Sequence, residues 1–79
     1  IEQVKLDDID ANFLDGNRIT LEKLRKAGLV SAECTGYTVT AGQRLTKPFI
    51  IIANDFTLEA VKMIALTGGR VIRLNQVNG

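Results

Sequence analysis

The chain has 79 residues, of which 46% are hydrophobic and 24% charged, which predicts one small globular domain rather than a disordered segment. Ten Lys and Arg against nine Asp and Glu give a net charge of +1, which argues against a polybasic tail. The longest apolar run, residues 49–53, falls far short of the roughly 20 residues that span a bilayer, and no signal-peptide pattern is present, so we expect no membrane partner.

Several kinds of site are excluded by residue types that are absent or occur once. There is no His, one Ser (Ser31) and one Cys (Cys34), so Ser-His-Asp and Cys-His catalytic groups and a Cys/His zinc site cannot be assembled. A single Cys forms no internal disulfide, which fits a reducing compartment or a fold that simply does not need an oxidising one. We therefore predict that the chain is not an enzyme and needs no cofactor, metal or small-molecule substrate.

Charge is distributed unevenly along the chain. Residues 1–15 hold five acidic residues against Lys5 alone, whereas residues 16–79 hold nine basic residues against four acidic ones. A moderately basic region of this kind is typical of a protein that contacts a polyanion. An ordinary solvated surface explains the same charge density about as well.

The N-terminal segment predicts a short strand followed by a helical turn. Residues 4–6 are the strand candidate, and Asp7 is expected to cap a brief turn that carries Ile9 and Phe13 toward the core. Residues 15–17 predict a loop.

Two helices are predicted by the same signal, a Thr followed by Leu and Glu. Thr20 is expected to cap a helix over residues 21–27, and Thr57 a helix over residues 58–67. Apolar residues precede each Thr at the spacing of a hydrophobic staple. Gly28 and the pair at 68–69 should end the helices in the left-handed conformation.

Extended segments are predicted after and between these helices. Residues 29–30 and 70–74 follow the two helix ends, so the chain is expected to contain two helix-to-strand units offset by 37 residues. Residues 37–40 alternate apolar and polar positions, as a half-buried strand does. Residues 49–52 are continuously apolar, as in a strand covered on both faces, with Pro48 at its entry and a turn at residues 42–44.

The two helices should present different surfaces. In the first, Leu21, Leu24 and Ala27 line one face, and the charged residues point away from it. In the second, Met63 and Leu66 lie off the apolar stripe formed by residues 58, 61, 64 and 65. This helix should therefore be covered on more than one side, either by another chain that contacts Met63 and Leu66 or by the core itself.

Acidic and glycine motifs do not make a convincing catalytic or metal site. Asp8, Asp10 and Asn12 open like a calcium loop, but Phe13 replaces the turn Gly and Ile19 replaces the bidentate Glu. The glycine pair at 68–69 follows a helix, whereas a phosphate loop would precede one. We interpret the acidic cluster as a capped turn.

Basic side chains form the better candidate site, because Arg can grip phosphate oxygens with two hydrogen bonds and Lys adds a point charge. The predicted RNA-binding residues are Arg18, Lys23, Arg25, Lys26, Arg44, Lys47, Arg70 and Arg73. Among them we favour Arg44, Lys47 and Arg70, since turns and strand ends project their side chains freely. The three Phe residues occupy apolar positions expected in the core, so base stacking on single strands is not predicted.

The order of several short motifs resembles the C-terminal domain of the ribosomal protein L15 family of the large subunit. The first half contributes residues 4–9, 16–20 and 24–30, the last ending in Ala-Gly-Leu-Val. The second half contributes Gly-x-x-Leu-Thr-Lys at 42–47, the apolar strand, Ala-x-x-Phe-Thr-x-x-Ala at 53–60, and Gly-Gly-x-Val at 68–71.

This resemblance implies an α/β domain built as a small irregular repeat of strands and helices. It also implies a non-catalytic protein that binds large-subunit ribosomal RNA beside neighbouring ribosomal proteins and supports subunit assembly. The family's basic, Gly-rich N-terminal arm is missing, so we expect residues 1–79 to be one compact domain at the C-terminal end of a longer protein. Pro48 and Asn54 replace a Lys and a His that are common in the family, and this dilution of charge suggests a mitochondrial or other organellar ribosome. A non-ribosomal protein-interaction module, or a fragment of an α/β enzyme, is the alternative.

Overall fold

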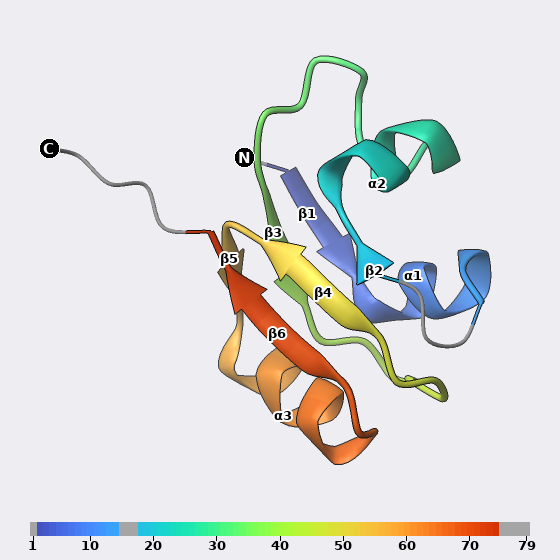
Figure 1. The fold of residues 1–79 in the computed structure, drawn as a ribbon, viewed down its shortest axis with the longest axis vertical. Helices are drawn as coiled ribbons and strands as arrows, with labels where there is room; N and C mark the ends of the chain where they lie inside the picture. Colours follow the sequence, from blue (N-terminus) through green and yellow to red (C-terminus); the bar gives the residue numbers. More distant parts are fainter. Residues whose placement is uncertain (1, 15–17, 75–79) are drawn as a thin grey trace, which may run out of the picture.

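The computed structural model describes residues 2–14 and 18–74, which form three helices and six strands (Figure 1). In chain order these are β1 (Glu2–Lys5), α1 (Leu6–Asn12), β2 (Arg18–Ile19), α2 (Leu21–Ala27), β3 (Tyr37–Thr40), β4 (Ile50–Ala53), β5 (Asp55–Phe56), α3 (Leu58–Leu66) and β6 (Arg70–Arg73). The predicted α/β class is confirmed. No helix in the described ranges is long and apolar enough to cross a membrane.

Odd-numbered and even-numbered strands form separate sheets of three parallel strands each. Sheet A has the order β1-β3-β5, and sheet B has the order β2-β4-β6. In Figure 1, sheet B faces the viewer with β4 between β2 and β6. The chain therefore alternates between the sheets, because parallel neighbours cannot be joined by a tight hairpin.

This alternation creates three consecutive units, each running from sheet A to sheet B. The first is β1-α1-β2, the second is β3 and β4 joined by residues 41–49, and the third is β5-α3-β6. The units lie side by side in chain order, so α1 and α3 occupy equivalent positions. Helix α2 lies between the first two units.

Of the two predicted helix-to-strand units, the second is confirmed, since β6 follows α3, and the first is wrong. Residues 29–30, expected as a strand after α2, belong to the irregular segment 28–36. Side chains hold this segment in place of a strand ladder: Arg25 Nε donates to the Cys34 carbonyl oxygen at 3.1 Å, and Glu2 accepts from the Ser31 hydroxyl at 2.6 Å.

The caps of α2 and α3 follow the sequence signals closely. The Thr20 hydroxyl accepts from the Lys23 amide, and the Thr57 hydroxyl accepts from the Ala60 amide at 3.2 Å, which confirms both predicted N-caps. Gly28 ends α2 with a φ of +77°, in the left-handed region as predicted. Helix α3 ends at Leu66, one residue before the predicted end.

The two glycines after α3 serve different purposes. Gly68 has a φ of +91° and closes the helix as predicted. Gly69 does not adopt the left-handed conformation, so that part of the prediction is wrong. A Cβ on Gly69 would lie 2.4 Å from the Phe49 carbonyl oxygen, so glycine is required there for the close approach of two backbones.

At the N-terminus the strand and the helix are shifted relative to the prediction. β1 spans Glu2–Lys5, and Leu6, expected in the strand, begins α1. Asp7 does not cap this helix: Lys5 is the N-cap residue and makes no side-chain cap hydrogen bond. The Asp7 carboxylate instead accepts from a distant loop, as described below. The loop predicted at residues 15–17 lies outside the described residues.

The core is formed by one face of each sheet together with buried helix residues. Val4, Val39 and Phe56 lie in one register row on the inner face of sheet A, while Ile19 and Ile51 lie in one row on sheet B. The helices add Leu6, Ile9, Leu24, Ala60 and Ile64. The Tyr37 hydroxyl donates to the Ile52 carbonyl oxygen and so ties the two sheets together.

Two predicted apolar faces are only partly buried. Along β4, Ile51 and Ala53 are fully buried but Ile50 and Ile52 are half-buried, so the strand is not covered on both faces. Helix α3 buries residues 60 and 64 but exposes Leu58 and residue 65. Residue 27, expected on the inner face of α2, is also exposed.

Candidate nucleic-acid interface

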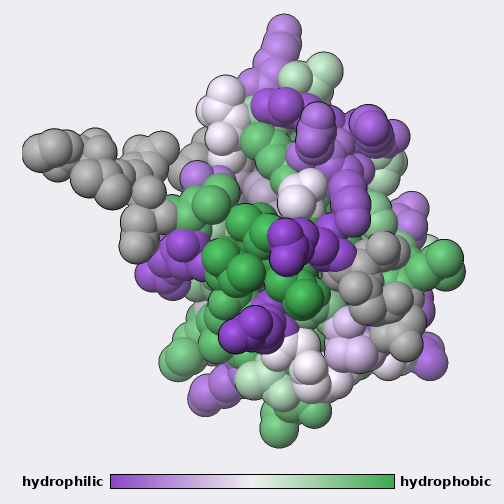
Figure 2. Space-filling view, in the orientation of Figure 1, coloured by the Kyte–Doolittle hydropathy of each residue, from purple (hydrophilic) through white to green (hydrophobic). Residues whose placement is uncertain are grey.

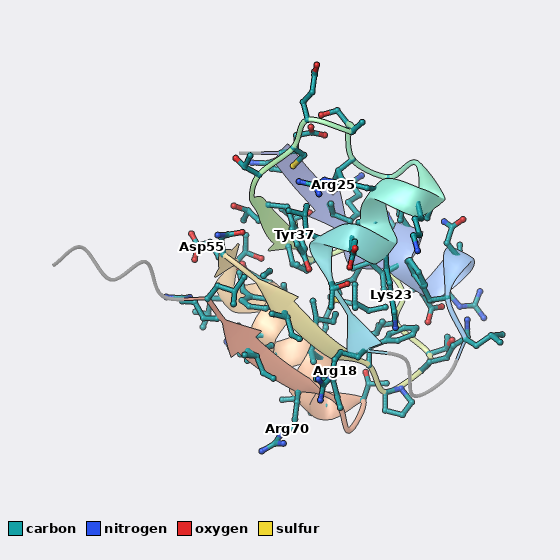
Figure 3. All side chains as sticks on the ribbon, turned by 45° about the horizontal axis from the view of Figure 1, so that its top comes forward. Arg18, Lys23, Arg25, Tyr37, Asp55 and Arg70 are labelled. Carbon is teal, nitrogen blue, oxygen red and sulfur yellow. The ribbon has the colours of Figure 1, made fainter. Side chains whose placement is uncertain are left out.

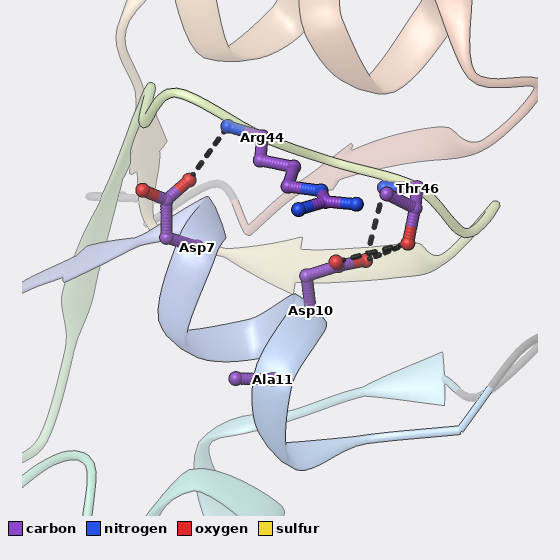
Figure 4. A pocket seen from close by; sticks show the side chains of 5 residues that line it. All are labelled: Asp7, Asp10, Ala11, Arg44 and Thr46. Atoms are coloured by element: carbon purple, nitrogen blue, oxygen red, sulfur yellow. Dashed lines mark hydrogen bonds between the residues drawn. The ribbon is translucent and has the colours of Figure 1, made fainter.

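The loop at residues 41–49 carries two of the predicted cations and is clamped by acidic side chains of α1 (Figure 4). The Asp7 carboxylate accepts from the Gln43 and Arg44 amides, each at 2.9 Å. The Asp10 carboxylate accepts from the Thr46 amide at 3.0 Å and from its hydroxyl. These contacts, which we call the α1 clamp, fix the loop that presents Arg44.

Hydrogen bonding favours the charged form of both clamp carboxylates. Backbone N–H groups of Arg44 and Gln43 lower the pKa of Asp7 below its ordinary value. Partial burial raises the pKa of Asp10, but the hydrogen bonds from Thr46 and the nearby charge of Lys47 outweigh it, so the net shift is downward. Both groups are therefore ionised at neutral pH and engaged with the loop.

A small hollow of about 340 Å³ lies between α1 and this loop, lined by Asp7, Asp10, Ala11, Arg44 and Thr46. Figure 4 shows the Arg44 side chain lying over it. In the described part of the chain, no group of three or more Cys, His, Asp or Glu side chains is placed to hold a metal ion. The hydrogen bonds of the α1 clamp already engage the acidic side chains, so we interpret the hollow as part of the structural contact between α1 and the loop.

Lys47 is held by the end of α1 rather than projecting freely. Its ammonium group donates to the Asp10 carbonyl oxygen and, at 3.1 Å, to the Phe13 carbonyl oxygen. The side chain is half-buried and satisfies carbonyl groups that a helix C-terminus leaves without partners.

Arg18 and Arg70, 52 positions apart in sequence, are brought to the same face of sheet B. Both pair in register with Ile50, Arg18 from β2 and Arg70 from β6. Residues in one row of a parallel sheet point to the same side, and both arginines are exposed. Figure 3 shows them at the same end of the sheet.

The cations of α2 differ in how free they are. Lys26 is exposed and Lys23 is half-buried. Arg25 donates from Nε and Nη2 to the Cys34 carbonyl oxygen, so its guanidinium is engaged in holding segment 28–36. Its role in the fold was not evident from the sequence, in which it belongs to the outward-facing charged side of the helix.

At the end of β6, Arg73 forms an ion pair with Asp55 across 3.2 Å. Both side chains are more than half exposed, so solvent screens the pair and its contribution to stability is small. It is the one ion pair found among the residues that the structure describes.

Comparison with known proteins agrees with the arrangement of these elements. Residues 3–72 match the family model described as ribosomal proteins 50S-L15, 50S-L18e and 60S-L27A. The chain belongs to this family. The predicted resemblance is thus confirmed over most of its length, from β1 to β6.

Curated members of the uL15 family are similar to this chain at moderate identity. The large ribosomal subunit protein uL15 of Geotalea daltonii is 37% identical over 68 residues, which cover 86% of this chain and 46% of that protein. The uL15 protein of Thermosipho africanus is 30% identical over 67 residues, covering 85% and 46% respectively, and that of Geobacter sulfurreducens is 39% identical over 59 residues, covering 75% and 40%. The chain therefore spans about half the length of the curated relatives that it matches.

The α1 clamp lies within the matched region but was not predicted from the sequence. Asp7 and Asp10 are three positions apart and so share one face of α1, which was the available signal. Gly42 was a second signal, since a Cβ there would lie 2.1 Å from the Asp7 carboxylate. From the sequence, Asp7 was expected to cap a helix and Gly42 to lie in a turn, so the contact between them was not anticipated.

The two residues predicted as a protein contact on α3 differ in exposure in this uL15-family chain. Leu66 is 88% exposed, whereas Met63 is partly buried and packs against the core. The core covers part of Met63 and leaves Leu66 exposed, so the protein contact expected from the sequence stays a prediction.

Proposed function

We propose that this chain is a structural, non-catalytic constituent of the large ribosomal subunit that binds large-subunit ribosomal RNA and supports subunit assembly. The observation that carries the proposal is the family match over residues 3–72, which contains every buried core residue of the domain. The relatives reported above are named as large ribosomal subunit proteins. No feature of the described residues favours the alternative of a non-ribosomal interaction module or an enzyme fragment.

The exposed cations support contacts to the RNA backbone. Arg18, Lys26, Arg44 and Arg70 are exposed, and none of them has an acidic partner among the described side chains. An arginine without an internal partner can give its guanidinium fork to phosphate oxygens. We propose Lys26 and Arg44 as the principal RNA contacts, because Arg18 and Arg70 flank Ile50 on the apolar outer side of sheet B.

The remaining predicted cations are expected to contribute less. Arg25 and Lys47 donate to backbone carbonyl groups, Arg73 is paired with Asp55, and Lys23 is half-buried. Each must give up an existing contact, or part of its cover, before it reaches a phosphate. Their proposed role in RNA binding is therefore secondary to holding the fold.

Neighbouring ribosomal proteins are the second class of partner that we propose. The outer face of α3 exposes Leu58 and Leu66, 65% and 88% of whose surfaces are accessible. These are the first and last residues of the helix, and large exposed apolar side chains of this kind support a protein contact along it. Met63 adds to this contact only through its exposed part.

We propose the ribosome as the location of this chain. The named relatives come from bacteria, so they lend no support to the mitochondrial or organellar location suggested by the sequence, which stays a prediction.

The test is binding to purified large-subunit ribosomal RNA over a range of salt concentrations, together with co-sedimentation with large subunits. Affinity should fall steeply with salt, since each phosphate contact releases counterions. The double substitution Lys26→Gln with Arg44→Gln should lower the slope of log affinity against log salt by roughly two for two contacts.

The matched control replaces two exposed lysines outside the proposed set, Lys5→Gln with Lys62→Gln, which changes net charge equally. Binding that does not depend on salt, or an equal loss in the control, contradicts the proposal.

A further inference from the structure

The outer face of sheet B is apolar, although no element of the described chain covers it completely. Arg18, Ile50 and Arg70 form one register row, and Ile52 and Ile72 lie in the next row on the same side. The Leu74 amide continues the ladder by donating to the Ala53 carbonyl oxygen at 2.8 Å, so Leu74 extends this side. We call this surface the isoleucine face: Ile50, Ile52, Ile72 and Leu74, with Arg18 and Arg70 at one end.

The corresponding surface of sheet A has the composition expected for solvent. Its rows contain Gln3, Thr38 and Asp55, then Lys5 and Thr40. Both sheets share one core and both consist of parallel strands, so the fold alone does not require isoleucine on the outside of one of them. The difference indicates that the isoleucine face has a purpose besides contact with water.

The isoleucine face is continuous and accessible. Ile72 and Leu74 are 39% and 48% exposed, and Ile50 and Ile52 are half-buried. Figure 2 shows an apolar patch at the centre of the molecule over β4 and β6, with hydrophilic side chains at its borders. Single exposed apolar residues are ordinary on a protein surface, whereas contiguous ones mark interaction sites.

We propose that the isoleucine face binds an extended segment of a neighbouring protein that has apolar side chains beside an acidic one. Because this proposal rests on the proposed function, the partner is a protein of the large ribosomal subunit. The apolar side chains cover Ile50, Ile52 and Ile72, and the carboxylate lies between Arg18 and Arg70.

Charge complementarity is the reason to expect an acidic group in the partner segment. Arg18 lies on β2 and Arg70 on β6, the two strands on either side of β4, so their backbones are about 10 Å apart with Ile50 between them. Two long guanidinium side chains at this separation can converge on one carboxylate, where charge-assisted hydrogen bonds are strongest. The strands of sheet B contain no acidic residue of their own to occupy this position.

The apolar part of the surface favours a protein over RNA as the occupant. Ribosomal RNA is bound through phosphates, base edges and stacking on planar side chains. Isoleucine and leucine offer neither charge nor a flat aromatic plane, and burying them against a phosphate backbone would desolvate charge without compensation. Apolar side chains of a peptide segment are the matching surface.

Photo-crosslinking from within the assembled particle tests the proposal. A benzophenone amino acid is placed at position 72 of the full-length protein, which is then assembled into large subunits of the source organism. A second form carries it at position 3, on the outer face of sheet A. Irradiation should link position 72 to a protein segment that contains Asp or Glu near apolar residues, and position 3 should not reach that segment.

Substitutions then test the arginines. Arg18→Gln with Arg70→Gln should lower the crosslink yield from position 72 about tenfold, while Lys5→Gln with Lys62→Gln should leave it unchanged. Co-sedimentation with a crosslink from position 72 to RNA, or with no crosslink, overturns this inference and leaves the proposed function standing. A yield that is unaffected by the arginine substitutions overturns the placement of the carboxylate. Failure to co-sediment at all overturns both.

Discussion

Gly69 allows two main chains to approach each other, and replacing it by alanine should destabilise the domain through a backbone clash. The added Cβ would lie 2.4 Å from the Phe49 carbonyl oxygen, 3.0 Å from the Phe49 nitrogen and 3.1 Å from Ile64 Cγ2. The first two atoms belong to the backbone, so no side-chain rotation relieves the contact. The start of β6 must move away from the residue preceding β4 by about 1 Å to restore ordinary separation.

This displacement would weaken two hydrogen bonds at the start of β6. Arg70 donates to the Phe49 carbonyl oxygen, and Gly69 donates to the Ile64 carbonyl oxygen, each at 2.9 Å. Overpacking costs about 1–3 kcal/mol, and the loss of one hydrogen bond adds about 1 kcal/mol. We therefore expect Gly69→Ala to cost about 2–4 kcal/mol of a total stability of about 4–12 kcal/mol for a chain of this length.

Gly28→Ala provides the matched control. Gly28 has a φ of +77°, but a Cβ there would meet nothing within 4 Å, so alanine suffers only the left-handed strain of about 1–2 kcal/mol. Urea denaturation followed by far-UV circular dichroism gives the free energy of unfolding for both variants. Gly69→Ala should be the less stable. A loss of stability at Gly69 no larger than that at Gly28 would refute the reasoning, because the backbone clash would then cost no more than left-handed strain alone.

Three further substitutions test other parts of the structure. Tyr37→Phe removes the donor to the Ile52 carbonyl oxygen and should lower the free energy of unfolding, measured by urea denaturation, by about 1–3 kcal/mol. Burial also raises the pKa of Tyr37, which is the only tyrosine in the sequence. In an alkaline titration, phenolate absorbance should therefore appear only as the protein unfolds. The pKa of Asp7 is lowered in the folded state, so the ionised carboxylate stabilises the fold above the ordinary pKa of about 4. This stabilisation is lost as the pH falls through the folded-state pKa. The wild type should therefore lose stability in this acidic range, and Asp7→Asn should show a smaller loss. Arg25→Gln should lower the melting temperature by releasing the Cys34 carbonyl while leaving the salt dependence of RNA binding unchanged, and a weaker salt dependence without a change in melting temperature would contradict this.

Elements defined by local chemistry were predictable from the sequence. Thr20, Thr57, Gly28 and Gly68 act through hydrogen bonds or backbone conformations within one or two turns of their own helix, so their neighbours in sequence determine what they do. The alternation of residues 37–40 likewise predicted β3, in which residues 37 and 39 face the core.

Elements defined by distant partners were not predictable. β2 and β5 contain two residues each, too few for any periodic pattern, and they exist because β4 and β3 offer them a ladder. The three-unit alternation between sheets was missed for the same reason: its second unit has no helix, and its first and third helices do not share a capping signal.

The candidate site shows the same difference between properties set locally and properties set by distant partners. The sequence identified the cations, since charge is a property of the residue type, but it could not tell a free cation from an engaged one. Lys47 is held by two carbonyl groups and Arg25 by one, from segments 9 to 37 positions away. Asp7 was assigned to a cap because a carboxylate binds backbone N–H groups equally well in its own helix or in a loop 36 positions away.

The incorrect expectation for β4 supports the inference about the isoleucine face. A continuous apolar run at residues 49–52 is typical of a parallel strand covered on both faces, and that pattern predicted a second cover. Within this domain Phe49, Ile51 and Ala53 are fully covered, whereas Ile50 and Ile52 are not. A protein segment bound across Ile50, Ile52 and Ile72 supplies the missing layer, so the pattern describes the strand as it would stand in an assembly.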